Sequence, residues 1–164
     1  MPLRIVKIEL CCRLLGDNGG QSMKKRCVSA CLLWVALLLI LPGNALAGAA
    51  CVIAKTMGNS EAIEWVHSSE SAEAVLFQAK QKLRERGYKY LFPQATTELE
   101  HAYLVIVESH YKSSRGKERT SYGCGFSEQS YDEALWAAIR NLQSYAWGWK
   151  PDREGYKITT KKQY

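Results

Sequence analysis

The sequence lacks an apolar run long enough to cross a membrane as a helix. Its longest such run, residues 27–41, has about 15 residues, whereas a membrane span needs about 20. A basic cluster, residues 23–26, precedes the run, and Ala45-Leu46-Ala47 follows it. This order of basic head, short apolar stretch and spaced small residues is typical of a secretory signal peptide. We therefore expect residues 23–47 to be removed and the protein to be exported, either periplasmic or secreted, and not an integral membrane protein.

Residues 1–22 do not fit a signal peptide, because the basic head normally lies at the start of the chain. We expect translation to begin at Met23, which makes residues 1–22 a mis-called extension. The alternative is a real extension ahead of the signal. Residues 48–164, which remain after cleavage, are enough for a single domain with a modest core.

These remaining residues also lack a strong net charge. The whole chain has 22 Lys and Arg against 16 Asp and Glu, a formal net charge of +6. Six of the basic and two of the acidic residues precede residue 48, which leaves 16 basic and 14 acidic residues. Since a nucleic-acid-binding protein normally keeps a concentrated basic face, we expect no nucleic-acid partner.

Cysteine is scarce in residues 48–164. Four of the six cysteines lie in the removed region, and Cys51 and Cys124 remain. An exported chain meets an oxidising compartment, where such a pair usually closes, so we predict a disulfide between them. The alternative is a lipid on Cys51, although such a site normally has Leu three residues earlier and this chain has Gly48 there.

Catalytic and metal-binding motifs are missing as well. The histidines, His67, His101 and His110, form neither a His-x-x-x-His pair nor a His–Glu helix motif, and there is no glycine-rich phosphate loop. Cys124 with a histidine could make a thiol hydrolase, but a disulfide is the simpler interpretation. Paired carboxylates remain open, because their spacing is spatial. We therefore predict no metal, no cofactor and no assignable catalytic residue.

What the sequence does contain is an internal repeat. The pattern around Ser71 recurs around Ser130, 59 residues later. Internal similarity of this kind predicts two copies of one unit, the first at about residues 51–95 and the second at about residues 101–160. Further pairs under the same offset are Leu76 and Leu135, Ala79 and Ala138, Leu83 and Leu142, Tyr88 and Trp147, and Tyr90 and Trp149.

Each copy is predicted to place a helix after two strands. Ser130 followed by Glu133 is a capping-box pattern, and Ser71 is the matching N-cap. Apolar residues at helical spacing follow each serine: Val75, Leu76, Ala79 and Leu83, then Leu135, Ala138, Ile139 and Leu142. The predicted strands are residues 51–57, 61–67, 101–111, 118–126 and 154–164. The economical architecture is α+β, an antiparallel sheet from two strand–strand–helix repeats with both helices packed on one face.

The segment SYGCGFSEQSYDEALWAAIRNL, and more loosely AIEWVHSSESAEAVLFQAKQKL, resembles a domain of unknown function in secreted bacterial proteins. In that family, tandem strand–strand–helix units follow a signal peptide. Those domains tend to carry more cysteines, including one near the helix end, where this chain has Leu83 and Leu142. The resemblance implies a bacterial, exported protein of this fold and supplies no activity.

Two surface features are candidates for binding. Tyr145, Trp147 and Trp149 alternate before a proline, so that an extended segment would carry all three on one side. They would make either a ligand platform or part of the core, and the matching Tyr88 and Tyr90 favour packing.

The second feature is the basic stretch YKSSRGKERT, predicted to be a hairpin tip. Its cations are Lys112, Arg115, Lys117 and Arg119, with Glu118 as the opposing charge. Such a tip either discourages edge-to-edge pairing of strands or forms an anion-binding finger. The sequence thus favours a small exported binding or inhibitory protein whose partner is a protein or an anionic surface or glycan. The alternative is a small periplasmic hydrolase with an unrecognised site.

Overall fold

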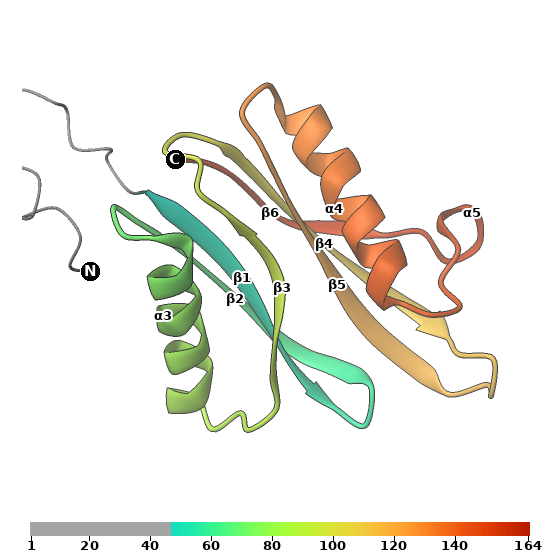
Figure 1. The fold of residues 1–164 in the computed structure, drawn as a ribbon. Coiled ribbons are helices and arrows are strands. Elements are labelled where there is room, and N and C mark those ends of the chain that lie inside the picture. The colour runs from blue at the N-terminus through green and yellow to red at the C-terminus, as the bar shows by residue number, and fades with distance from the viewer. Residues whose placement is uncertain (1–46) are drawn as a thin grey trace, which may run out of the picture. The chain divides into compact units, whose positions relative to one another are not determined.

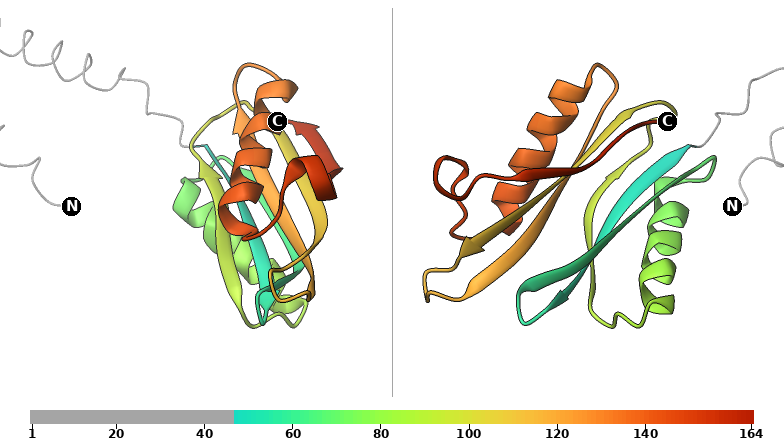
Figure 2. Two further views of the ribbon diagram at one scale, coloured as in Figure 1. Left: turned by 90° about the vertical axis from the view of Figure 1, so that its right-hand side faces the viewer. Right: turned by 180° about the vertical axis from the view of Figure 1, so that it is seen from behind.

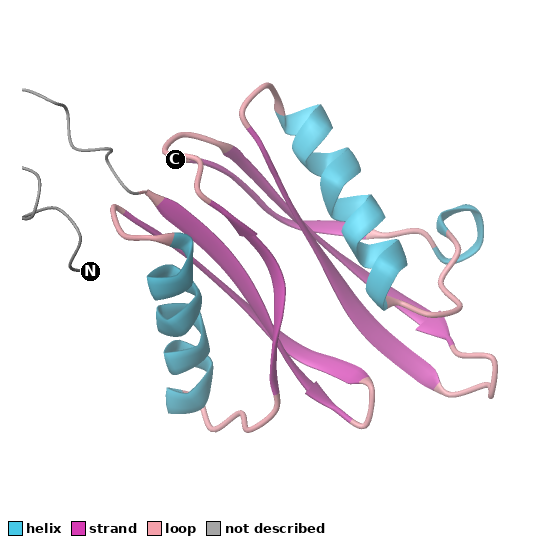
Figure 3. Cartoon of the chain, in the orientation of Figure 1, coloured by secondary structure: helices cyan, strands magenta, loops and turns pink. Residues whose placement is uncertain are grey.

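Both predicted hairpins and both predicted helices are present, but the hairpins belong to different sheets. The computed structural model describes residues 47–164 (Figure 1), so residues 1–22 and the predicted signal peptide, apart from Ala47, lie outside it. The elements in chain order are β1 (Gly48–Thr56), β2 (Asn59–Ser68), α3 (Ala72–Glu85), β3 (Leu91–Thr97), β4 (Tyr103–Lys112), β5 (Glu118–Ser127), α4 (Tyr131–Tyr145), α5 (Pro151–Glu154) and β6 (Lys157–Gln163) (Figure 3).

The strands form two three-stranded antiparallel sheets, ordered β2-β1-β3 and β5-β4-β6. The fold class is therefore α+β, but the prediction of a single sheet is wrong. The reason lies in the two middle strands. Residues 49–54 of β1 are each at most 1 % exposed, and residues 104–107 of β4 are equally buried. Since successive side chains of a strand point to opposite faces, both faces of β1 and β4 need a cover, which one sheet with helices on one face does not provide.

Each sheet has a helix on its outer face and the other sheet on its inner face (Figures 1 and 2). Helix α3 buries Val75, Ala79 and Leu83 against the first sheet. The corresponding buried residues of α4, against the second sheet, are Ala134, Ala138, Ile139 and Leu142. Leu76 and Leu135, predicted on the same helix faces, are partly buried at their margins.

Serine side chains begin both helices, as the sequence predicts. Ser71 Oγ accepts a hydrogen bond from the backbone N of Ala74 at 3.3 Å, and Ser130 Oγ accepts one from Glu133 N at 3.2 Å. Each bond satisfies an amide that has no partner within the first helical turn. The two caps therefore fix where the helices start on their sheets.

The predicted disulfide is confirmed and lies between the two sheets. Cys51 of β1 is bonded to Cys124 of β5, and the sequence separation is 73 residues. Both cysteines are buried, together with Leu104 and Ile106 of β4. The bond leaves Cys51 no thiol to carry a lipid, and it leaves Cys124 none to act as a nucleophile. Side chains packed around this inner core include Ile63, Trp65, Tyr122, Phe126 and Tyr164.

A β-bulge in β3 turns Gln94 toward the second sheet. The register of β1 against β3 shifts between Cys51 and Val52, which leaves Gln94 as the extra residue. Gln94 is buried, and its Nε2 donates to the backbone O of Tyr122 at 2.8 Å and to Asn141 Oδ1 at 2.7 Å. Side-chain amides from β3 and α4 therefore cover part of the outer edge of β5.

Helix α4 lies directly on two glycines of β5. A Cβ atom on Gly125 would be 2.1 Å from the backbone O of Ala134, and one on Gly123 would be 2.1 Å from that of Ala138. Real side-chain carbons do not approach backbone oxygens so closely, so these positions need glycine for the close contact between strand and helix.

The disulfide is expected to contribute a large part of the stability. The double variant Cys51→Ser/Cys124→Ser should unfold with a free energy lower by up to about 4 kcal/mol, because the cross-link restricts the unfolded chain over a long loop. Urea denaturation measures this difference. Thiol titration of the denatured, exported form should find no free thiol, and two reactive thiols per chain would contradict the disulfide.

Adding a methyl group at Gly125 should displace α4. Gly125→Ala is expected to lower the free energy of unfolding by about 1–3 kcal/mol or more, because overpacking forces the backbone to move. Urea denaturation is again the measurement, with Ser114→Ala in the exposed β4–β5 turn as a control that should change stability by less than about 0.5 kcal/mol. Equal stability of the Gly125 variant and its parent would be incompatible with this helix contact.

Candidate functional site

The structure separates the tryptophans that were predicted to share one side of a strand. After α4 the chain turns: Trp149 N donates to Ala146 O at 3.0 Å, and Gly148 has a φ of 101°. Trp147 is therefore 91 % exposed, whereas Trp149 is 5 % exposed, with its Nε1 donating to Gly155 O at 2.9 Å. The predicted extended segment is wrong, because a glycine with positive φ reverses the chain. The prediction that these aromatic residues pack in the core holds for Trp149 and is wrong for Trp147.

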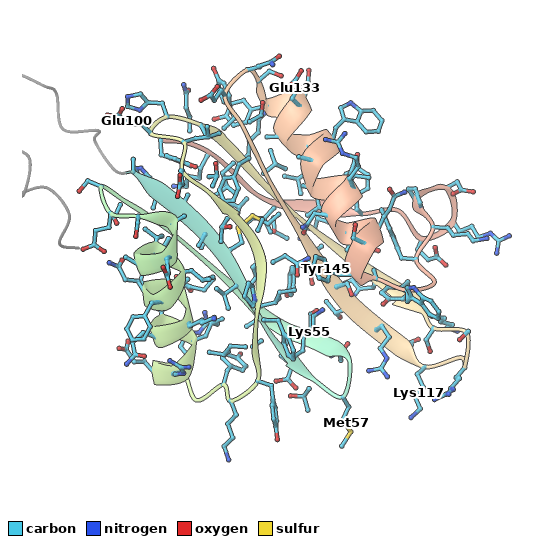
Figure 4. The ribbon with its side chains drawn as sticks, in the orientation of Figure 1. Lys55, Met57, Glu100, Lys117, Glu133 and Tyr145 are labelled. Carbon is cyan, nitrogen blue, oxygen red and sulfur yellow. A yellow bond between two sulfur atoms is a disulfide. The ribbon has the colours of Figure 1, made fainter. Side chains whose placement is uncertain are left out.

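Tyr145, the third aromatic candidate, lies at the end of α4 and contacts a lysine of the first sheet. The ammonium group of Lys55 is 5.3 Å from the centre of the Tyr145 ring and 5.8 Å from that of Phe92 (Figure 4). Burial lowers the pKa of Lys55. Because cations favour the faces of aromatic rings, the contact of Lys55 with the two rings connects β1 to β3 and α4. The Tyr145 ring therefore already has a partner within the protein.

The four basic candidates all lie on the β4–β5 hairpin, where the sequence predicts them. Lys112 ends β4, Arg119 lies near the start of β5, and Arg115 and Lys117 belong to the turn between them. Lys112, Arg115 and Lys117 are exposed, and Arg119 is partly buried. Figure 4 shows Lys117 on this hairpin. The hairpin thus carries a basic surface, here defined as these four residues.

Directly after its turn, the β4–β5 hairpin is attached to the β1–β2 turn of the other sheet. Arg119 Nη1 donates to the backbone O of Met57. Thr120 N donates to Asn59 Oδ1 at 2.7 Å. These two hydrogen bonds connect the ends of the two sheets, so the basic surface has a fixed place relative to the first sheet.

A cleft of about 590 Å³ lies at this attachment. It is lined by Asn59, His110, Tyr111, Lys112, Glu118, Arg119, Thr120 and Glu154. Two members of the basic surface, Lys112 and Arg119, are part of the lining. The sequence did not point to Asn59, Thr120 or Glu154, because these residues come from β2, β5 and α5 and no local pattern joins them.

His110 of the cleft lining connects the hydroxyl group of Thr120, which also lines the cleft, to the carboxylate of Glu108, which does not. Its Nδ1 is 3.0 Å from Thr120 Oγ1, and its Nε2 is 3.2 Å from Glu108 Oε1. The register explains the arrangement, since His110 and Thr120 are directly opposite in the antiparallel pair and Glu108 is two residues away on the same face of β4. The side chains of His110 and Glu108 are 73 % and 22 % exposed. We call these three residues the relay.

Glu108 also influences a neighbouring phenol. Tyr122 lies directly opposite Glu108 in the β4–β5 pair. Burial, and secondly the negative charge of Glu108, raise the pKa of Tyr122, because both disfavour a phenolate there. The Tyr122 side chain is therefore a neutral neighbour of the relay.

Comparison with protein-family models, with curated proteins and with solved structures finds no match for this chain. Within residues 47–164, no three His, Cys, Asp or Glu side chains are grouped to hold a metal ion. No helix in that range is long and apolar enough to cross a membrane. Arguments about function therefore depend on the cleft, the relay and the basic surface.

The two tryptophans should behave differently on truncation. Trp149→Ala is expected to lower the free energy of unfolding by about 3–5 kcal/mol, as is usual for a buried aromatic residue. Trp147→Ala should change it by less than about 0.5 kcal/mol, because the side chain is exposed. Urea denaturation of both variants gives the comparison, and equal losses would show that the turn at Gly148 does not separate them.

Proposed function

We propose that the protein is a small exported binding or inhibitory protein that contacts an acidic partner through its basic surface and the adjoining cleft. The observation that carries this proposal is the position of four cations on one hairpin beside a cleft of about 590 Å³. The partner chemistry is an anionic glycan, an anionic surface or an acidic protein. Binding of this kind needs no cofactor.

The charge of the hairpin supports an acidic partner. Glu118 is the one carboxylate among residues 111–120, which contain the four cations, and it lies directly opposite Lys112 in the pair. Arg115 and Lys117, in the turn, are exposed. An exposed ion pair contributes about 0.2–1 kcal/mol, so several contacts together are needed for useful affinity. Such binding should weaken with salt, because the contacts are at the surface.

The hydrogen bonds of the hairpin support binding with little loss of conformational freedom. The turn is closed by Ser113 N donating to Lys117 O at 2.9 Å and by Gly116 N donating to Ser113 O at 2.8 Å. Arg119, the second residue of β5, attaches the hairpin to Met57. A surface that is already ordered loses less entropy when a partner binds.

Export belongs to the same proposal. A disulfide between Cys51 and Cys124 suits an oxidising compartment, and residues 23–47 have the order of a signal peptide. These two features are independent of each other, since the signal lies outside the residues that form the disulfide.

We also propose that the two halves are copies of one strand–strand–helix unit followed by a further strand. Both sheets have the first strand of their half in the middle, and the caps Ser71 and Ser130 are 59 residues apart. The third strand of each half has a bulge, at Gln94 in β3 and at Thr159 in β6. These recurrences support the repeat and, with it, the resemblance to tandem domains of secreted bacterial proteins.

Removal of three hairpin cations should weaken binding to a sulfated glycan. The variant Lys112→Gln/Arg115→Gln/Lys117→Gln is expected to raise the Kd for heparin about tenfold at low salt, because three contacts of about 0.5 kcal/mol are lost. The control Arg84→Gln/Lys89→Gln/Lys162→Gln removes the same charge at exposed positions elsewhere and should leave the Kd within about twofold. Equal weakening in both variants would mean that net charge, and not the hairpin, determines binding.

A further inference from the structure

We infer that the relay is a hydrolytic site whose substrates are carboxylic esters, with Thr120 as the nucleophile and His110 as the general base. This inference goes beyond binding. It names the residues of a site for the hydrolase that the sequence analysis left as the alternative. Two residues of the relay, Thr120 and His110, line a cleft of about 590 Å³, within the usual size of small-molecule sites of about 300–1,000 Å³.

The hydrogen-bond partners of His110 determine where its proton lies. The Glu108 carboxylate, 3.2 Å from Nε2, can only accept, so Nε2 carries the hydrogen in the neutral imidazole. Nδ1 then has its lone pair toward Thr120 Oγ1 at 3.0 Å, and the hydroxyl donates to it. A hydroxyl that donates to an imidazole, itself oriented by a carboxylate, is the arrangement that activates a nucleophile.

The position of Thr120 is fixed from two sides. Its backbone N donates to Asn59 Oδ1 at 2.7 Å, and its branched side chain has few rotamers. The contrast with Thr159 is informative, because the hydroxyl of Thr159 donates to the backbone O of Ile106 at 3.3 Å. A threonine hydroxyl in this sheet can thus satisfy a backbone carbonyl, whereas that of Thr120 is bonded to an imidazole.

The side-chain amide of Asn59 suits an acyl substrate. Asn59 uses its amide oxygen for Thr120 N, so its amide nitrogen remains to donate to an oxyanion formed beside Thr120. The cations Lys112 and Arg119 line the same cleft together with the carboxylates Glu118 and Glu154, so the formal charges of the lining balance and select no charge on the ester.

The reaction has two balanced steps. Thr120 Oγ attacks the ester carbonyl carbon while its proton moves to His110 Nδ1; the bond to the alcohol oxygen breaks, and the alcohol leaves with that proton. A water molecule then attacks the threonyl ester and gives its proton to His110 Nδ1. The bond between the acyl carbon and Oγ breaks, the carboxylic acid leaves, and Thr120 regains its hydrogen from His110. Glu108 is a positioning residue throughout.

The test is acylation by p-nitrophenyl acetate. The folded protein should release p-nitrophenolate in a burst of one equivalent per chain, and peptide mass spectrometry should find an acetyl group on Thr120. Thr120→Val, which keeps the shape of the side chain, should abolish the burst, and Thr120→Ser should retain it. His110→Ala should slow it at least 100-fold, the usual contribution of a general base. Glu108→Gln keeps an acceptor for Nε2 and should preserve far more of the rate than Glu108→Ala.

Controls of the same residue types separate the relay from ordinary surface chemistry. Thr160→Ala on β6 and His101→Ala before β4 should leave the burst unchanged. An acetyl group on lysines alone, or an unchanged burst in Thr120→Val, would overturn the inference. Heparin binding by the parent protein is measured separately from acylation of Thr120. Failure to bind heparin therefore does not contradict the hydrolytic site, and absence of a burst does not contradict the proposed binding.

Discussion

β1 and β4 have apolar side chains on both of their faces, and the rest of the structure follows from covering them. Burying a Val, Leu or Ile side chain stabilises the fold by about 1.5–3 kcal/mol relative to leaving it exposed. Val52 and Ile53 lie on opposite faces of β1, as Ile106 and Val107 do on β4, and all four are buried. A helix covers the outer face of each strand and the opposite sheet covers the inner face. The disulfide Cys51–Cys124 then joins the inner faces covalently.

The edge of β5 shows how the two sheets are held beside each other. Its backbone groups bond to three side-chain amides from separate elements: Asn59 of β2, Gln94 of β3 and Asn141 of α4. Backbone groups of an edge strand would otherwise invite pairing with another chain. Strand addition at these positions is therefore blocked.

The inner faces change character along the strands. Near the disulfide they are apolar, with Leu104 and Ile106 buried. Two residues beyond Ile106 the same face of β4 continues with Glu108, and then with His110 and Lys112, toward the cleft. The attachment of Thr120 to Asn59 lies at this open end. Binding and hydrolysis are thus proposed for one region because the apolar core ends there and polar groups from both sheets come together.

The sequence alone determined the features that depend on neighbours in the chain. These are the serine caps Ser71 and Ser130, the helix faces with Leu83 and Leu142, the strands other than β3 (Leu91–Thr97), the basic hairpin and, because two cysteines remained, the disulfide. Tertiary structure decided the rest. A strand that is apolar on both faces does not reveal whether a helix or a sheet covers it, so two sheets were taken for one. The alternating aromatic residues at 145, 147 and 149 did not reveal that the chain turns at Gly148 and exposes Trp147. The partnership of His110 with Thr120 depends on the register that the β4–β5 turn sets, and register is a property of pairing between strands, which no single segment of sequence contains.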